Sequence, residues 1–497
     1  MGATSCHVLL LQIGMVMDAV AGMTAAPAMA NAHAVSRFSP RPAQPQAAHA
    51  ASPSVPAELL TPRVRSLLRT RSPPLRMVAE SLSRPSPGKA TRPKRGRLNV
   101  RIDDAWYDLT NWRAAHPAGT HWIDAYNNSD ATEVMYGFHS DAAMSMIKRL
   151  PVSKSPPTDV PPPTKTTYAF RELRNQLEAE GWYKTQPFGE ALKLAPWALF
   201  SVAGLWLSRY SRGIAVLGSV FCIAVSNTLA GWLAHDYVHG RGRFSTFMRP
   251  FGELFGGMST TWWSNKHNMH HALTNEVGYD EDIALEPFIY LWSPDPAKDS
   301  KLRKIQHLYW PLPFSSLFYY WRLDSLRFAQ KHRKWGELSR LVAHWAFYLT
   351  VFPAKQLLLG IWLSGFMTST IVTATHQSEE IFMKETSRKH DFPEAQFRST
   401  RNARIPGWGP FAHGPFSSML WGGMQWQLEH HLFPTVPRYR YPELSKRLKA
   451  FADSNGLDYR VTDEWDLIKL NIETLKELST LQPIEGNPDS TPVFKQV

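Results

Sequence analysis

Residues 425–434 read QWQLEHHLFP, and within them Gln427, His430 and His431 stand at positions i, i+3 and i+4. On an α-helix such side chains share one face, with Cβ atoms about 5–6 Å apart. Two earlier segments have the same kind of spacing, HDYVH at 235–239 and HNMHH at 267–271. Both of these begin with histidine, whereas the third begins with glutamine. Gln427 is therefore either a lost ligand or a substitute ligand of a shared site.

The three segments predict a metal centre built from imidazoles. They contain seven of the 19 histidines, too many for one tetrahedral zinc but enough for two ions of higher coordination number. A single histidine near an apolar helix is usually a hydrogen-bonding core residue, but three clusters with helical spacing favour metal binding. With only Cys6 and Cys222 in the chain, a thiolate site or a disulfide framework is excluded. The predicted ligands from these segments are His235, His239, His267, His270, His271, Gln427, His430 and His431.

Three further residues complete this prediction. Asp236 and Glu429 lie inside the clusters and are expected to support the ligands, since metal-bound histidine usually donates its other N–H to a carboxylate or carbonyl. His376 ends an apolar run and is expected to be an eighth histidine ligand, with an interfacial role as the alternative. The remaining candidates are interpreted as structural: His307, His344, His390 and His413.

Two uncharged segments, 213–234 and 356–375, are long enough to cross a hydrocarbon core of about 30 Å. Shorter apolar runs at 194–208 and 341–353 precede them and are interpreted as their partners in two hairpins. The two ends of a membrane-spanning hairpin lie on the same side of the membrane, so all three clusters would face that side. The aromatic segment 307–323 is expected to lie in the interface.

The N-terminal region, 1–98, is interpreted as a disordered leader. It is rich in Ala, Ser, Pro and Arg, which favours a transit peptide over the alternatives of a secretory signal or a simple disordered tail. Residues 1–100 hold 13 Lys and Arg against 3 Asp and Glu, whereas the other 397 residues hold 42 against 39. The basic charge thus belongs to the leader, and we expect no nucleic-acid partner.

The motifs resemble those of the membrane fatty acid desaturases, and within them the front-end acyl desaturases with a fused cytochrome b5-like domain. HDYVH, NKHNMHH and QWQLEHHLFP are similar to the three histidine boxes, and WWSNKHNMHHALTNEVGYDEDI and LEHHLFPTVPR extend the likeness. The resemblance implies a mainly α fold: four membrane spans with a cap that holds two iron ions, preceded by a small α+β domain. It also implies that His376 joins the ligands and that Gln427 is typical of the front-end branch.

The segment DDAWYDLTNW…HPAGTHW…SDATEVMYGFHS resembles cytochrome b5, which implies haem b held by His116 and His139. Two axial imidazoles leave no open position, as expected of an electron carrier. The chain departs from the usual pattern at Ala118, where HPGG has glycine, and at Ser129. If the first of these glycines needs a positive φ, alanine costs about 1 kcal/mol there.

The expected domains are a leader at 1–98, a haem domain at 99–150, a Pro-rich linker at 151–167, a desaturase domain at 168–470 and a tail at 471–497. The expected activity is O2-dependent desaturation of a membrane-lipid acyl chain near its carboxyl end. A reductase of cytochrome b5 reductase or ferredoxin type would supply electrons, and Trp262 and Trp263 would line the substrate tunnel or else anchor the interface. The multi-pass protein would sit in a plastid membrane, with the endoplasmic reticulum as the alternative. Sphingolipid long-chain-base desaturation, acyl hydroxylation and a non-catalytic haem electron carrier remain open.

Overall fold

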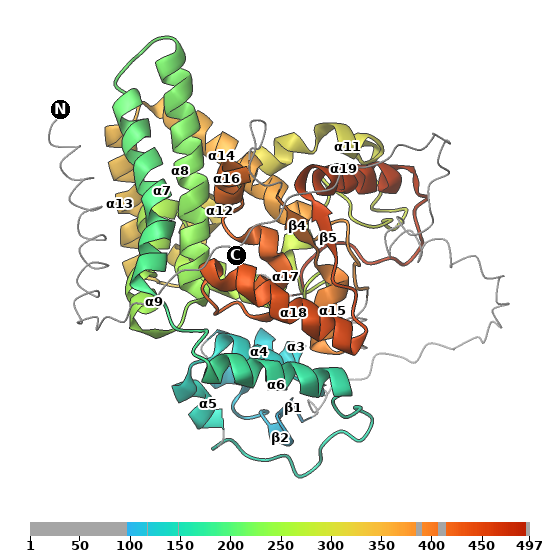
Figure 1. The fold of residues 1–497 in the computed structure, drawn as a ribbon. Helices are drawn as coiled ribbons and strands as arrows, with labels where there is room; N and C mark the ends of the chain where they lie inside the picture. The colour runs from blue at the N-terminus through green and yellow to red at the C-terminus, as the bar shows by residue number, and fades with distance from the viewer. Residues whose placement is uncertain (1–96, 117, 148, 384–389, 406–413, 494–497) are drawn as a thin grey trace, which may run out of the picture.

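The computed structural model describes residues 97–493 apart from 117, 148, 384–389 and 406–413. The predicted leader, except for residues 97 and 98, and His413 lie outside these residues. The described chain forms a small N-terminal domain packed against a larger helical body (Figure 1).

Long helices form one side of the body, where α7 (Pro187–Leu207) runs beside α8 (Ile214–His239). Helix α14 (Ala354–Ala374) packs against both α8 and α12 (Pro311–Lys331), and α13 (Trp335–Val351) precedes it. By length and composition, α8 and α14 are long and apolar enough to cross a membrane. At 26 residues, α8 is about 39 Å long. It is therefore longer than a hydrocarbon core, and its last turn with His235 and His239 can emerge from one.

The histidine-bearing end of the body is built from shorter elements. Helix α10 (Thr260–Ala272) begins at Ser259, whose side chain accepts a hydrogen bond from the Trp262 amide. A π-helical turn, Gly252–Gly256, precedes it, and the short strands β4 (Asn402–Arg404) and β5 (Val461–Asp463) pair in parallel nearby. The remaining helices of the body are α9 (Gly242–Met248), α11 (Gln306–Tyr309), α15 (Phe392–Ser399), α16 (Gly414–Trp421), α17 (Gln427–Leu432), α18 (Tyr441–Asn455) and α19 (Glu464–Thr480).

The turn before α17 fixes the third cluster against the first. Gly422 has φ 58°, and a Cβ there would clash with the indole of Trp232 on α8. The same indole donates a hydrogen bond to the Leu420 carbonyl, 2.7 Å away. Trp232 is three residues before His235, so this contact sets the position of QLEHH relative to HDYVH.

The small domain contains a three-stranded sheet of order β2-β1-β3, made of β1 (Asn99–Ile102), β2 (Ala105–Asp108) and β3 (Ser129–Asp130). Strand β1 is antiparallel to β2 and parallel to β3. Three helices, α3 (His121–Ala125), α4 (Thr132–Phe138) and α5 (Asp141–Ile147), contribute Ile123, Val134 and Ile147 to one hydrophobic core with Val100 and Ile102 of β1.

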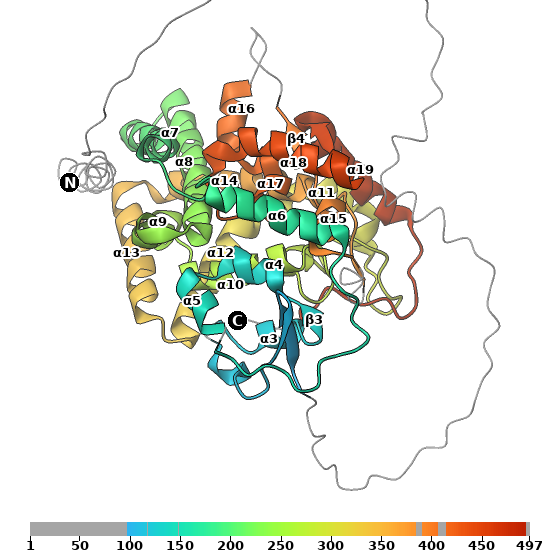
Figure 2. The ribbon, with the colours of Figure 1, turned by 60° about the horizontal axis from the view of Figure 1, so that its bottom comes forward.

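The small domain docks on the body through α10 and through α6 (Lys165–Ala179), which lies between the domain and α18 (Figure 2). Arg171 of α6 donates to Glu133 at 2.7 Å and to Asp130 at 3.0 Å. The Tyr126 hydroxyl donates to the Ala272 carbonyl at 3.1 Å. These contacts bring the small domain to the helix that carries the second histidine cluster.

One expectation from the sequence differs from this architecture. The predicted boundary at 470 falls within α19, which continues to Thr480 because Leu475 and Leu478 are buried against the body. The aromatic segment 307–323 contributes most of its length to α12, which packs along α14 and buries Phe318 and Trp321 while Leu312, Tyr320 and Leu323 are exposed. Its place in the interface stays a prediction.

The close approach of α12 and α14 predicts that Gly365→Ala destabilises the protein. A Cβ at Gly365 would clash with the backbone oxygen of Ser315 on α12, so the two helices would have to separate. Overpacking of this kind costs about 1–3 kcal/mol. Thermal unfolding of the detergent-solubilised protein should show a lower midpoint. The control Gly336→Ala, where a Cβ would lie 3.5 Å from the flexible end of Arg340, should leave the midpoint unchanged or higher, and equal midpoints for both variants would contradict the tight packing.

Candidate metal centre

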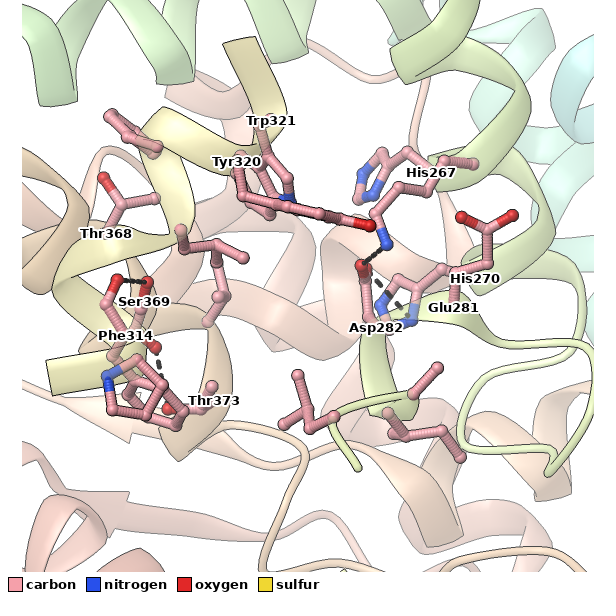
Figure 3. Close-up of a pocket in the computed structure, with 18 of the residues that line it drawn as sticks. His267, His270, Glu281, Asp282, Phe314, Tyr320, Trp321, Thr368, Ser369 and Thr373 are labelled. Atoms are coloured by element: carbon pink, nitrogen blue, oxygen red, sulfur yellow. Dashed lines mark hydrogen bonds and ion pairs between the residues drawn. The ribbon is translucent and has the colours of Figure 1, made fainter. Parts of the chain in front are cut away.

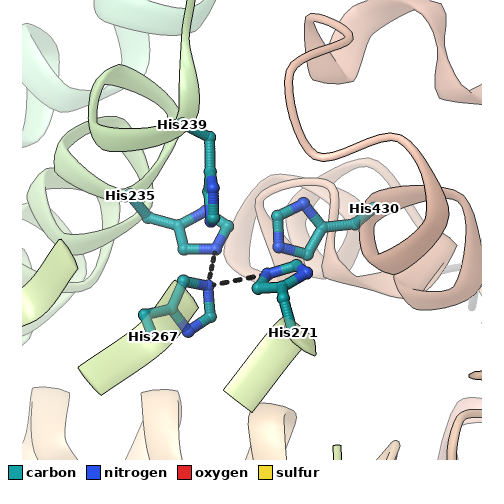
Figure 4. Close-up of side chains that lie close together, drawn as sticks. All are labelled: His235, His239, His267, His271 and His430. Carbon is teal, nitrogen blue, oxygen red and sulfur yellow. Dashed lines mark hydrogen bonds between the residues drawn. The ribbon is translucent and has the colours of Figure 1, made fainter. Parts of the chain in front are cut away.

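Five histidines from three helices form one buried group (Figure 4). One ring nitrogen from each residue lies within 4.8 Å of the corresponding nitrogen of every other. Helix α8 contributes two rings, α10 two and α17 one, and all five are at most 6% exposed. The group consists of His235, His239, His267, His271 and His430.

His267 stands at the middle of this five-histidine group. Its Nε2 atom lies 2.8 Å from Nε2 of His235 and 3.1 Å from Nε2 of His271. A neutral imidazole has one N–H donor and one acceptor nitrogen, so these rings cannot all satisfy one another.

A three-histidine group lies beside the first and consists of His270, His376 and His431. Gln427 completes it, because its side-chain nitrogen lies 3.0 Å from His376 Nε2 and 3.4 Å from His431 Nε2. The amide is thus directed at the ring nitrogens of the three-histidine group. Rotation of the amide by 180° would place its oxygen, a possible metal ligand, at the same point.

Four of the rings are held at Nδ1 by residues outside the clusters. Asp280 lies 2.8 Å from His270, the Ser399 carbonyl 3.0 Å from His376, Gln396 Oε1 2.9 Å from His431, and the Tyr441 hydroxyl 3.1 Å from His430. Contacts of this type fix the ring orientation and leave Nε2 free to bind a metal. Sequence reasoning missed all four partners. Only Asp280 left a signal, as an acid ten residues after His270.

The two carboxylates expected to support the ligands differ in their contacts. Asp236 accepts a hydrogen bond from Lys193 at 3.0 Å and lies 3.8 Å from Nδ1 of His235. Glu429 accepts hydrogen bonds from Tyr459 at 2.5 Å and from Asn402 at 2.8 Å. The expectation for Glu429 is therefore corrected: its position in α17, between Gln427 and His430, turns it away from the face that carries the ligands.

Burial sets the charge of the rings on α10 and α17. Burial, reinforced by neighbouring histidines, holds the pKa of His267, His271 and His430 well below the ordinary value. Burial alone would also lower the pKa of His270, but the Asp280 carboxylate raises it above the ordinary value. Burial raises the pKa of Glu429 to about 7, against its hydrogen bonds with Tyr459 and Asn402. Most of the rings are thus neutral, as metal binding requires.

The unpartnered atoms of the two groups fit a metal. Both ring nitrogens of His239, Nε2 of His430 and Oε1 of Gln427 are buried without a hydrogen-bond partner among the described residues. A buried polar atom without a partner costs about 1–3 kcal/mol, and several such atoms at one place are suited to binding a cation. Neutral imidazoles and one amide are ligands that suit iron, zinc or copper.

A cavity of about 1040 Å³ reaches these groups from the direction of α12 and α14. His267 and His270 lie across it from Thr368 and Ser369 (Figure 3). Trp262 and Trp263 both line the cavity, and the Trp263 ring stacks on His267 with centroids 5.1 Å apart. Of the predicted metal ligands, five line it: His235, His267, His270, His376 and Gln427.

In the small domain, His116 and His139 face each other with ring centroids 6.2 Å apart. This separation fits one metal ion bound by both rings, since metal–imidazole bonds are about 2.0–2.1 Å. His116 Nδ1 contacts the Gly119 carbonyl at 3.0 Å. Burial, reinforced by His116, lowers the pKa of His139 to about 4. Both rings are therefore neutral at neutral pH and able to hold a haem iron.

The departures at Ala118 and Ser129 carry no backbone strain. Neither residue has a positive φ; the glycine of this loop that needs one is Gly119, with φ 110°, and Asn128 has φ 55° beside Ser129. The expected cost of alanine in HPAG is therefore corrected, because the left-handed position is one residue later.

Three histidines interpreted as structural, His307, His344 and His390, lie in neither histidine group. His344 Nδ1 contacts the Leu254 carbonyl at 2.9 Å, and His390 pairs with Glu394 at 3.2 Å. Both contacts are those of ordinary structural histidines.

Comparison with known proteins agrees with both sites. The fatty acid desaturase model matches residues 212–463, and the cytochrome b5-like heme/steroid binding domain matches residues 89–154. The chain is 29% identical to an acyl-lipid 8-desaturase of Rebecca salina, over 74% of this chain and 88% of that protein. It is 27% identical to a Delta(6)-fatty-acid desaturase of Caenorhabditis elegans, over 77% and 96%, and to a Delta(8)-fatty-acid desaturase of Euglena gracilis, over 73% and 90%.

The desaturase match covers all three histidine clusters and His376, and the haem-domain match covers His116 and His139. The family implies iron and a membrane-associated enzyme, and the smaller domain implies haem. A mainly helical body with buried imidazoles at the end of an apolar cavity is what such an enzyme needs. The chain belongs to the fatty acid desaturase family and carries a cytochrome b5-like domain before its desaturase domain.

Proposed function

We propose that this protein is an O2-dependent acyl-lipid desaturase of the front-end type, which introduces a cis double bond near the carboxyl end of a polyunsaturated acyl chain. The observation that carries the proposal is the cavity of about 1040 Å³ whose wall includes histidines of both groups. The relatives named as 8-, Delta(6)- and Delta(8)-desaturases support the front-end type.

In this proposal the five-histidine group holds one iron ion, and His270, His376 and His431 with Gln427 hold a second. Bound iron would supply the activation of O2 and the removal of two hydrogens from the acyl chain. The protein contributes neutral ligands and an orientation fixed at Nδ1. Asp280 gives the second site a carboxylate-backed histidine, which raises the basicity of His270.

The cavity wall determines where the acyl chain lies. It is mostly apolar and aromatic, which favours a hydrocarbon chain and excludes water from the reacting carbon. Its charged residues are acidic except for Lys266, which pairs with Asp282 at 2.6 Å. This balance disfavours a polyanionic carrier such as coenzyme A and supports a lipid-bound acyl substrate.

The small domain would hold haem b between His116 and His139 and relay electrons from a reductase of cytochrome b5 reductase or ferredoxin type. Its docking supports this role. Phe138, the residue before His139, packs edge-on against His271 of the five-histidine group, with ring centroids 6.2 Å apart. The haem ligand and a metal ligand are thus linked through one aromatic side chain.

For location we propose a multi-pass protein with α7, α8, α13 and α14 as its four spans. A plastid membrane is favoured by the composition of residues 1–98, with the endoplasmic reticulum as the alternative. A fluorescent protein fused after residue 98 would separate the two, since only a transit peptide should direct it to plastids.

Expression in yeast fed with polyunsaturated fatty acids should yield a fatty acid with one new cis double bond on the carboxyl side of the existing ones. Gas chromatography and mass spectrometry of the methyl esters would locate that bond. His430→Ala should give no product, because it removes a ligand of the five-histidine group, whereas His307→Ala should keep at least half of the product. Oxygen retained in the product would identify a hydroxylase, and absence of product from purified protein that contains haem and iron would sink the proposal.

Asp280→Asn should weaken iron binding about 10–100-fold, the usual effect of losing a residue that orients a metal ligand. One carboxylate oxygen accepts from His270 and the Asn275 backbone and the other accepts from the Asp282 backbone, whereas an amide has only one acceptor oxygen. Iron per chain would be measured by mass spectrometry after dialysis against a graded series of chelator. Asp466→Asn, on an exposed pair with Lys469, is the matched control, and equal iron retention by both variants would show that Asp280 has no such role.

A further inference from the structure

Gly231 stands on α8 one helical turn before His235, on the same face of the helix, and lines the cavity. It is only half-buried, although the residues that flank it on α8, Ala230 and Trp232, are buried. The backbone of Gly231 is therefore open to the cavity next to the five-histidine group.

Packing does not require a glycine at this position. A Cβ on Gly231 would meet a single atom within 4 Å, Cζ of Phe318 on α12, at an ordinary contact distance of 3.7 Å. The backbone is not left-handed there. Other glycines of the long helices differ, since a Cβ at Gly360 would clash with Ile223 and one at Gly365 with the Ser315 backbone.

Glycine inside a helix is destabilising relative to alanine, so α8 carries an unfavourable residue where its own fold would accept a side chain. The space that the missing side chain leaves belongs to the cavity, between α8 and Phe318. The absence of a side chain at Gly231 thus leaves space in the cavity one helical turn from His235, a proposed metal ligand.

We propose that Gly231 is a specificity-determining residue. Because it has no side chain, it leaves room for the acyl chain to pass across the face of α8 beside the histidine groups. The inference rests on the proposed desaturase function. A chain with cis double bonds is bent and needs more width than a straight one, and Gly231 with Phe318 sets the width at this point. Any side chain larger than hydrogen narrows the passage without disturbing the ligands.

The test uses Gly231→Ala and Gly231→Leu in the full-length protein. Gly218→Ala and Gly218→Leu are the matched controls on the same helix. Gly218 does not line the cavity, and a Cβ there would meet the flexible end of Leu207 at 3.1 Å. Binding is followed by the fluorescence of cis-parinaric acid, a bent polyene fatty acid, so that this readout is independent of turnover.

We expect Gly231→Leu to raise the Kd for cis-parinaric acid at least tenfold and Gly231→Ala about threefold, with iron content equal to that of the wild type. The melting temperature of Gly231→Ala should not fall. In membranes prepared from the yeast, the KM for the acyl substrate should rise by a larger factor than kcat falls. In fed cells, the ratio of products from competing fatty acids should change at least threefold. The Gly218 variants should bind the probe as the wild type does.

Wild-type probe binding by Gly231→Leu would overturn the inference. A lower melting temperature for Gly231→Ala would do the same, because the glycine would then serve packing. Failure of the proposed function can be distinguished from failure of this inference. If the wild-type protein makes no product in yeast, binding of cis-parinaric acid to the variants still shows whether Gly231 controls access to the cavity.

Discussion

Eight buried imidazole rings at one end of the helical body impose the constraint on which the rest of the structure depends. A ring nitrogen inside a protein must have a partner or lose the free energy of its hydration. The protein supplies Nδ1 partners for His270, His376, His430 and His431 but, among the described residues, leaves Nε2 of His430 and both ring nitrogens of His239 without a partner. A bound cation would satisfy these atoms, so metal binding would be coupled to the stability of this region.

The same constraint explains why such distant segments meet. Helix α8 delivers its histidines at its last turn, and α14 ends just before His376. Trp232 holds the turn before α17 against α8, which brings His430 to the first cluster. The cytochrome b5-like domain then docks on α10 through Tyr126 and Phe138, so that its own histidine pair lies near the histidine groups. The cavity and the cytochrome b5-like domain thus approach the histidine groups through different elements.

Local spacing made the histidines predictable, because positions i, i+3 and i+4 share a helix face whatever the tertiary fold. The long apolar segments were equally clear, and α7, α8, α13 and α14 lie where the apolar runs predict helices. The sequence could not predict which residues far apart in the chain contact one another. The side chain of Gln396 and the carbonyl of Ser399 contact the rings of His431 and His376 from α15, a short helix that carries no motif. Glu429 was misjudged because proximity in sequence was taken for proximity in space, and Gly119 shows that the left-handed position in HPAG is one residue later than the pattern suggested.

Gln427 illustrates both the success and the limit of the sequence. Its helical spacing predicts the face of α17 on which it lies, but does not predict which residues it contacts. It contacts His376, 51 residues away, and joins the three-histidine group rather than the five-histidine group. The two groups are therefore chemically unequal. The first has five neutral imidazoles, whereas the second has three, one of them backed by Asp280, together with a neutral amide. An amide is a weaker donor than imidazole, so in the proposed two-iron centre it would fill the fourth position of the second group but be easily displaced, while Asp280 would add electron density through His270. The glutamine that breaks the histidine pattern would thus make the two proposed sites different without leaving either one incomplete.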